Sequence, residues 1–231
     1  MEQNNGRGIF YGVIGVATLV VAIIGATFAY FSSQNNTADD AIQTGTATVA
    51  NYTLVADSAV DTKTGLIPVK SSDANFAKHI GTSATSCLDD SANKYPMCTV
   101  YTYTIGNESN VAQETYVTLK PSALSKFTNL HYAIYDGKPA DGAFSAPADA
   151  LATDKFTGTD PINLTTALGT SGVLTLGAKG TATATKTFTI VLWLEEAGAD
   201  NNAEVGGTFA AGLTVSNSAT GNTGITAVLT A

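Results

Sequence analysis

Two histidines are the residues of this chain with the best capacity for metal chemistry. A common type of zinc protease places two histidines one helical turn apart with a glutamate between them, so that both imidazoles hold the metal and the carboxylate acts as the base. Here His79 is followed by Ile-Gly-Thr and His131 by Tyr-Ala-Ile, so neither window contains a carboxylate. The sequence also has no G-x-S-x-G elbow and no phosphate loop. We therefore predict that the chain is not an enzyme and takes no metal, no cofactor and no small-molecule substrate.

Two acidic stretches have the oxygen-rich composition of calcium sites. The first places Asp89, Ser91 and Asn93 like the opening ligands of a calcium loop, but Lys94 and Val100 stand where that loop requires Gly and Glu. The second stretch contains four carboxylates that could hold Ca²⁺ weakly at a contact between subunits: Glu195, Glu196, Asp200 and Glu204. For this second stretch we favour a solvated turn between two strands.

The two cysteines, Cys87 and Cys98, are separated by ten residues. An even cysteine count in an oxidising compartment is typical of a disulfide. A metal site would need further ligands, but there is no C-x-x-C motif and neither histidine is close in sequence. Closing a loop of this length stabilises a fold by about 3 kcal/mol in the chain-entropy model. The pattern predicts a structural disulfide that pins an irregular loop.

The longest apolar segment covers residues 9–31 and contains no charged residue. As a helix it would be about 34 Å long, enough to cross a bilayer core of about 30 Å. Arg7 precedes the segment, and Asp39 and Asp40 follow it. Because cationic flanks stay on the cytoplasmic side, we expect the remaining 200 residues to lie outside the cell or on its surface.

The apolar segment is either a cleaved signal peptide or a retained membrane anchor. The small residues Thr27 and Ala29, at the third and first positions before the cut, favour cleavage between Ala29 and Tyr30. For the domain division we take residues 1–30 as the signal peptide or transmembrane helix and residues 31–231 as the extracellular domain. The length of the segment exceeds a typical signal core and favours retention, in which case residues 9–31 stay in the membrane. A pilin-like subunit is less favoured, because Val13 stands where such pilins carry glutamate.

The exported part has the alternation expected of β-strands. In residues 181–194 the apolar side chains of Phe188, Ile190 and Leu192 share one face, and threonines with Trp193 share the other. Further strands are predicted at residues 46–56, 99–105, 114–119, 131–135, 208–215 and 225–229, with the strands at 181–194 and 208–215 forming a hairpin. One helix is predicted at residues 72–80. The pattern favours an all-β domain, a jelly-roll or Ig-like β-sandwich, preceded by the N-terminal apolar helix.

Composition excludes several other classes of protein. The formal net charge is −8, with 11 Lys and Arg against 19 Asp and Glu, which argues against nucleic acid as a partner. Hydrophobic residues make up 44% of the chain and charged residues only 13%, so intrinsic disorder does not describe it.

Three stretches resemble the TasA/camelysin family of secreted biofilm-matrix and cell-surface fibre proteins. After the apolar segment, TFAYFSSQNNTADDAIQTGTATV is similar to the start of the mature chains of that family. Next, VYTYTIGNESNVAQETYVTL resembles its unit of strand, Asn-rich turn and strand, and FTIVLWLEEAGADNNAEVGGTFAAGLTV resembles its closing hairpin. The resemblance covers both ends and part of the middle of the chain. It departs from the family pattern at Tyr30, a bulky residue at the position before the mature start at Phe31.

The resemblance implies a jelly-roll-like domain that is exported and assembles with itself into extracellular fibres through a donated N-terminal strand. Residues 41–56 contain no Lys, Arg or Pro, which suits a strand given to a neighbour. The candidate donor positions are Ala41, Ile42, Thr46, Val49, Tyr52 and Leu54. The alternative is that this run folds back as the first strand of its own sheet. We therefore expect a structural subunit of a fibre or biofilm matrix; the alternative is a membrane-anchored monomeric surface protein or adhesin.

Overall fold

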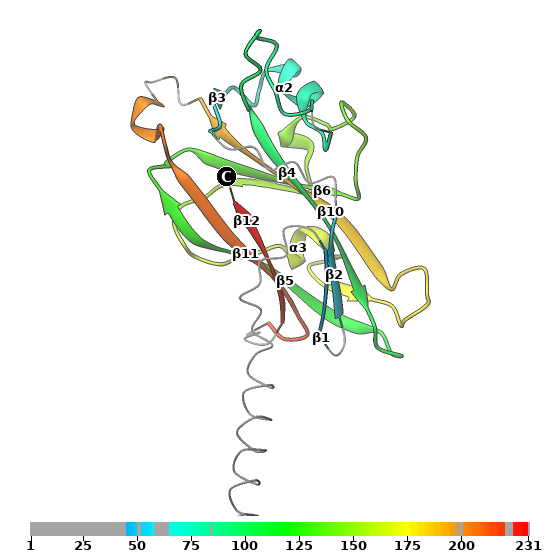
Figure 1. Ribbon diagram of the computed structural model, residues 1–231. Coiled ribbons are helices and arrows are strands. Elements are labelled where there is room, and N and C mark those ends of the chain that lie inside the picture. Colours follow the sequence, from blue (N-terminus) through cyan, green and yellow to red (C-terminus); the bar gives the residue numbers. More distant parts are fainter. Residues whose placement is uncertain are drawn as a thin grey trace, which may run out of the picture. The chain divides into compact units, whose positions relative to one another are not determined.

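The computed structural model describes residues 45–49, 52–57, 65–83, 85–196, 198, 201–219 and 224–230 (Figure 1). The expected N-terminal helix with its cleavage residues Ala29 and Tyr30 lies outside the described residues, as do Ala41, Ile42 and Asp200. No helix within the described ranges is long and apolar enough to cross a bilayer.

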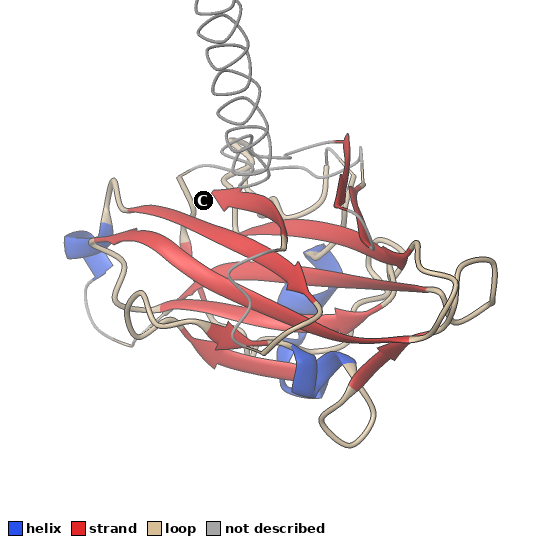
Figure 2. Ribbon diagram, turned by 90° about the horizontal axis from the view of Figure 1, so that it is seen from below, coloured by secondary structure: helices blue, strands red, loops and turns tan. Residues whose placement is uncertain are grey.

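Two antiparallel sheets pack face to face as a β-sandwich, which confirms the mostly β prediction (Figure 2). The first sheet has seven strands, of which the two-residue β3 pairs in parallel with the end of β10. In spatial order its strands are β1 (Gly45–Val49), β2 (Tyr52–Ala56), β4 (Cys98–Asn107), β10 (Thr185–Glu195), β6 (Leu130–Asp136) and β7 (Ala152–Lys155), with β3 (Pro68–Val69) beside β10.

The second sheet has five strands and is built around the long strand β5. Its order is β12 (Ile225–Thr230), β11 (Thr208–Ser216), β5 (Gln113–Ser125) and β8 (Ile162–Asn163), with β9 (Leu174–Leu176) also paired to β5. In the described part of the chain, four short helical elements lie in the connections: α2 (Ala74–His79), η1 (Pro147–Asp149), α3 (Thr165–Leu168) and η2 (Asn201–Glu204).

The main core fills the space between the sheets, because alternate residues of each strand point inward. Tyr103 of β4 lies opposite Phe188 of β10, and Tyr101 lies opposite Ile190, all of them at most 2% exposed. Phe188, Ile190 and Leu192 therefore share the inner face, and Trp193 belongs to the outer face, as the alternation predicts.

A second apolar cluster covers part of the outer face of the seven-stranded sheet. Trp193 packs there against Phe76 of α2, with ring centroids 5.8 Å apart. The helix begins where predicted, because the side chain of Asp73 accepts a hydrogen bond from the N–H of Asn75 and so caps its first turn. Strand β10 is thus buried on both faces, which explains why its sequence is apolar beyond strict alternation.

Two predictions of strand connectivity are wrong. Residues 46–56 form two strands instead of one: β1 and β2 pair antiparallel with Val49 opposite Tyr52, so the chain reverses between them. Strands β10 and β11 do not form a hairpin, since β10 pairs with β4 and β6 whereas β11 pairs with β5 and β12. Alternation identifies strands but does not say which sheet each strand joins, and the connection between β10 and β11 is long enough to cross from one sheet to the other.

Candidate assembly edge

Strand β1 forms one edge of the seven-stranded sheet. It pairs with β2 on one side, and no described strand pairs with its other side. Its sequence, Gly-Thr-Ala-Thr-Val, contains neither a charged residue nor proline. An edge strand presents unpaired N–H and C=O groups, so an uncharged edge is a template for another strand. This edge is the candidate functional site.

Two other exposed edges, at β7 and along the free part of β5, carry residues that discourage pairing. Strand β7, at the opposite edge of the same sheet, ends in Asp154 and Lys155, both exposed. Strand β5 continues past the short partner β8 with Lys120 and Pro121, and a proline has no N–H to donate. The N–H of Val117, also in β5, is occupied because it donates to the hydroxyl of Thr165 at 2.9 Å. Charge, proline and side-chain caps thus protect these edges but not β1.

Strand β12 is an uncharged edge of the five-stranded sheet, with the sequence Ile-Thr-Ala-Val-Leu-Thr. It lies beside β2 and β1 of the facing sheet. The two uncharged edges therefore meet on the same side of the sandwich, where an incoming strand would find the least electrostatic opposition.

The structure divides the predicted donor segment between two strands. Thr46 and Val49 lie in the edge strand β1, whereas Tyr52 and Leu54 lie in β2, where they are 4% and 0% exposed. The Tyr52 hydroxyl donates to the carbonyl of Glu114 in the second sheet at 3.3 Å, and burial raises its pKa. In this fold Tyr52 and Leu54 belong to the subunit's own core, as the fold-back alternative expects.

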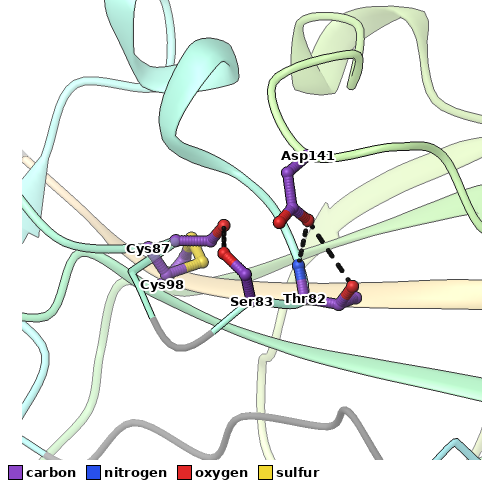
Figure 3. The surroundings of a disulfide bond; sticks show 6 residues. Thr82, Ser83, Cys87, Cys98 and Asp141 are labelled. Atoms are coloured by element: carbon purple, nitrogen blue, oxygen red, sulfur yellow. Dashed lines mark hydrogen bonds between the residues drawn. A yellow bond between two sulfur atoms is a disulfide. The ribbon is translucent and has the colours of Figure 1, made fainter.

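The disulfide between Cys87 and Cys98 is present, with a Cα–Cα distance of 4.9 Å (Figure 3). Both cysteines are at most 2% exposed and belong to the outer cluster around Trp193. Beside the bridge, Asp141 accepts a hydrogen bond from the N–H of Thr82 at 2.7 Å, and this bond is the main cause that lowers the pKa of the Asp141 carboxyl. The bridge thus ties the loop before β4 to the sheet, and Asp141 ties the loop after β6 to the same place.

The candidate metal ligands are used in local contacts. His79 lies 3.3 Å from the carboxylate of Asp90, and the ring of His131 packs against Trp193, where burial lowers the pKa of the imidazole. The side chain of Asp89 accepts from the N–H of Tyr95 and so braces its own loop. Among the described residues, no three His, Cys, Asp or Glu side chains converge as metal ligands.

The prediction that Glu204 lies in a solvated turn is wrong, because its side chain is buried. The residue is 4% exposed, and one carboxylate oxygen accepts from the N–H groups of Thr128 and Asn129 and from the Thr128 hydroxyl, at 2.6 to 2.7 Å. The other oxygen accepts from the side-chain amide of Asn201 at 2.7 Å. Burial alone would raise the pKa of Glu204, but these hydrogen bonds lower it below its ordinary value. Sequence reasoning missed this role because the donors lie about 75 residues away.

A scan against protein-family models finds no match to this chain. A search of curated proteins likewise finds no match.

Proposed function

We propose that this chain is an exported structural subunit of the cell surface or extracellular matrix, and that it assembles with itself through the edge of β1. The observation that carries the proposal is the contrast among sheet edges. Strand β1 is uncharged and without proline, whereas β7 and the free part of β5 carry charges or proline. Natural monomers protect their edge strands, so the side of the sandwich where the uncharged edges β1 and β12 lie beside each other favours pairing with another strand.

The incoming strand is the N-terminal part of a neighbouring mature chain, which includes Ala41 and Ile42. Main-chain hydrogen bonds along the five residues of β1 supply affinity, and such pairing tolerates many side chains. Because the donated segment and the accepting edge are different surfaces, each subunit can give to one neighbour and receive from another. Such a head-to-tail contact propagates into a filament when its rotation does not close.

Other features agree with this proposal. The buried disulfide suits an oxidising extracellular setting. The connections from β4 to β5 and from β10 to β11 cross between sheets, as in a sandwich of the jelly-roll type, which we propose as its finer class. The resemblance to the TasA/camelysin family favours fibre formation after export, with residues 9–31 holding the precursor in the membrane until cleavage.

The alternative function is a membrane-anchored monomeric surface protein. This alternative is favoured by the length of the apolar segment. It is also favoured by the bulky Tyr30, which directly precedes Phe31, the first mature residue that the family resemblance implies. In that case residues 9–31 stay in the membrane and β1 remains a free edge.

The experiment that tests the proposal adds one positive charge to β1. Thr48, Thr53, Gly106 and Thr185 follow one another across four paired strands, so Thr48→Lys and Thr185→Lys change the two ends of the same row, one on the edge strand β1 and the other on β10, three strands away. The exported mature protein is concentrated and examined by negative-stain electron microscopy. We expect fibres from the wild type and from Thr185→Lys, and none from Thr48→Lys. Fibres from Thr48→Lys equal to those of the wild type would reject the role of β1.

A further inference from the structure

The sequence contains the motif Asn-x-Ser/Thr, with x other than proline, at Asn35, Asn51, Asn107 and Asn163. In an exported protein this motif is the acceptor of N-linked glycans, which attach to the side-chain amide nitrogen of the asparagine. Asn107 and Asn163 belong to the described part of the chain, and Asn35 and Asn51 do not. The fold gives the two described motifs opposite surroundings.

The first described motif has no room for a glycan in the folded domain. Asn107 is 2% exposed, and its side-chain amide nitrogen donates to the carbonyls of Val111 and Gly177, each at 2.8 Å. These hydrogen bonds hold the β4–β5 connection against the segment that follows β9. A sugar on this nitrogen would replace one of its two protons and collide with the groups around it. A chain modified at Asn107 could not complete this packing, so we expect no glycan there.

The second described motif leaves its asparagine open. Asn163 is exposed at the end of the two-residue strand β8, where it lies opposite Thr118 of β5. Its side-chain oxygen accepts a hydrogen bond from the N–H of Thr165 at 2.9 Å. No group in the described part of the chain accepts a hydrogen bond from its amide nitrogen. The nitrogen that a glycan needs is therefore available, while the oxygen of the same amide orients the side chain.

The neighbours of Asn163 in the chain divide into exposed and buried residues. Residues 159–161 before it and Thr166 after it are exposed. Leu164 and Thr165 are 1% and 3% exposed, and the Thr165 hydroxyl accepts a hydrogen bond from the N–H of Val117 in β5. A bulky group on Asn163 would thus stand outside the contact between α3 and β5, among residues that already face solvent.

We propose that Asn163 carries an N-linked glycan in the exported protein. The donor is an oligosaccharide bound through C1 to a lipid pyrophosphate. The amide nitrogen of Asn163 forms a bond to C1, the bond between C1 and the pyrophosphate oxygen breaks, and one amide proton is lost to the departing pyrophosphate. Because the Thr165 hydroxyl is buried against Val117 in the folded domain, the transfer takes place before α3 packs on β5. The inference rests on the export that the proposed function includes.

A glycan on Asn163 would leave the assembly edge free. In the order of the five-stranded sheet, β8 and β12 lie at opposite ends, and β12 is the strand beside β1 and β2 of the facing sheet. A bulky, hydrated group at β8 therefore lies on the side of the sandwich away from β1. There it hinders the addition of a foreign strand beside β8 and β5, which adds to the protection that Lys120 and Pro121 give.

The test is peptide mapping by mass spectrometry of exported protein collected from the cells that produce it. We expect the wild-type peptide with Asn163 to carry an oligosaccharide and the peptide with Asn107 to carry none. Asn163→Asp keeps an acceptor oxygen for the N–H of Thr165 but has no amide nitrogen, so it should lose the glycan completely. Thr165→Ser keeps the hydroxyl of the motif, and Asn110→Asp changes an exposed asparagine outside any such motif, so both should retain it.

The wild-type map decides the inference even if a variant does not fold. An unmodified Asn163 in exported wild-type protein overturns it, and so does a glycan on Asn107 of the folded domain. If filaments form through β1 while Asn163 is unmodified, the proposed function stands and only the glycan is wrong. A chain that is not exported overturns both, because the transfer requires export.

Discussion

Replacing Glu204 by glutamine should destabilise the domain strongly, although the side chain keeps its size. The carboxylate accepts three hydrogen bonds on one oxygen and a fourth, from Asn201, on the other. A hydrogen bond to a charged group contributes about 1.5–3 kcal/mol to stability, and one between neutral groups contributes about 1 kcal/mol. The three hydrogen bonds on the first oxygen become neutral in the glutamine variant, which should cost about 3 kcal/mol in total. The new amide N–H₂ also faces the amide of Asn201, which then loses its acceptor. The expected loss is a large part of the total stability of a domain, which is about 5–15 kcal/mol.

The assay is urea unfolding followed by the fluorescence of Trp193, the single tryptophan. With a urea dependence of about 2 kcal/mol per molar, Glu204→Gln should lower the midpoint by about 1.5 M. Glu196→Gln, an exposed carboxylate in the same connection, is the control and should change stability by less than about 0.5 kcal/mol. Equal midpoints for Glu204→Gln and the wild type would refute the reasoning.

The same variant tests the pH dependence. Because hydrogen bonds hold the folded-state pKa of Glu204 below its ordinary value of 4.5, its contribution to stability is fully present above about that pH and is lost as the pH falls through the folded-state pKa. The difference between wild type and Glu204→Gln should therefore be constant near neutral pH and shrink below pH 4.5. A difference that grows on acidification would contradict the direction of the shift.

Three further outcomes are expected. Removing the disulfide with Cys87→Ala and Cys98→Ala should lower the free energy of unfolding by about 3 kcal/mol, and intact-mass measurement of exported protein should find no free thiol. Leu54→Ala should cost about 2–5 kcal/mol in the monomer while Thr53→Ala in the same strand costs little; no effect of Leu54→Ala would mean that β2 is not part of the subunit's own core. Protein supplied with zinc should release no more peptides from casein than a buffer control does. A protease activity that disappears in His79→Ala or His131→Ala would refute the proposal that the chain is a structural subunit without catalytic activity.

Local features were predictable from the sequence because they depend on neighbouring residues. The alternation that places Phe188 and Ile190 inward follows from strand geometry, and the helix near Phe76 follows from its Asp73 cap. The disulfide was predicted from the even cysteine count and from the expectation that the chain is exported.

The features that sequence reasoning missed depend on residues far apart in the chain. Whether β11 pairs with β10 or with β5 is decided by the packing of two sheets, and nothing in the alternation of either strand carries that information. The burial of Glu204 depends on donors in another connection. A run of four carboxylates looks like a solvated turn until those donors are in place.

The most direct test of self-assembly through β1 is a cryo-electron microscopy reconstruction of filaments formed by the exported mature protein. The proposal predicts a strand from a neighbouring subunit hydrogen-bonded along Gly45–Val49, extending the seven-stranded sheet by one strand. Filaments in which the outer side of β1 faces solvent, or a preparation that contains only monomers at high concentration, would contradict it.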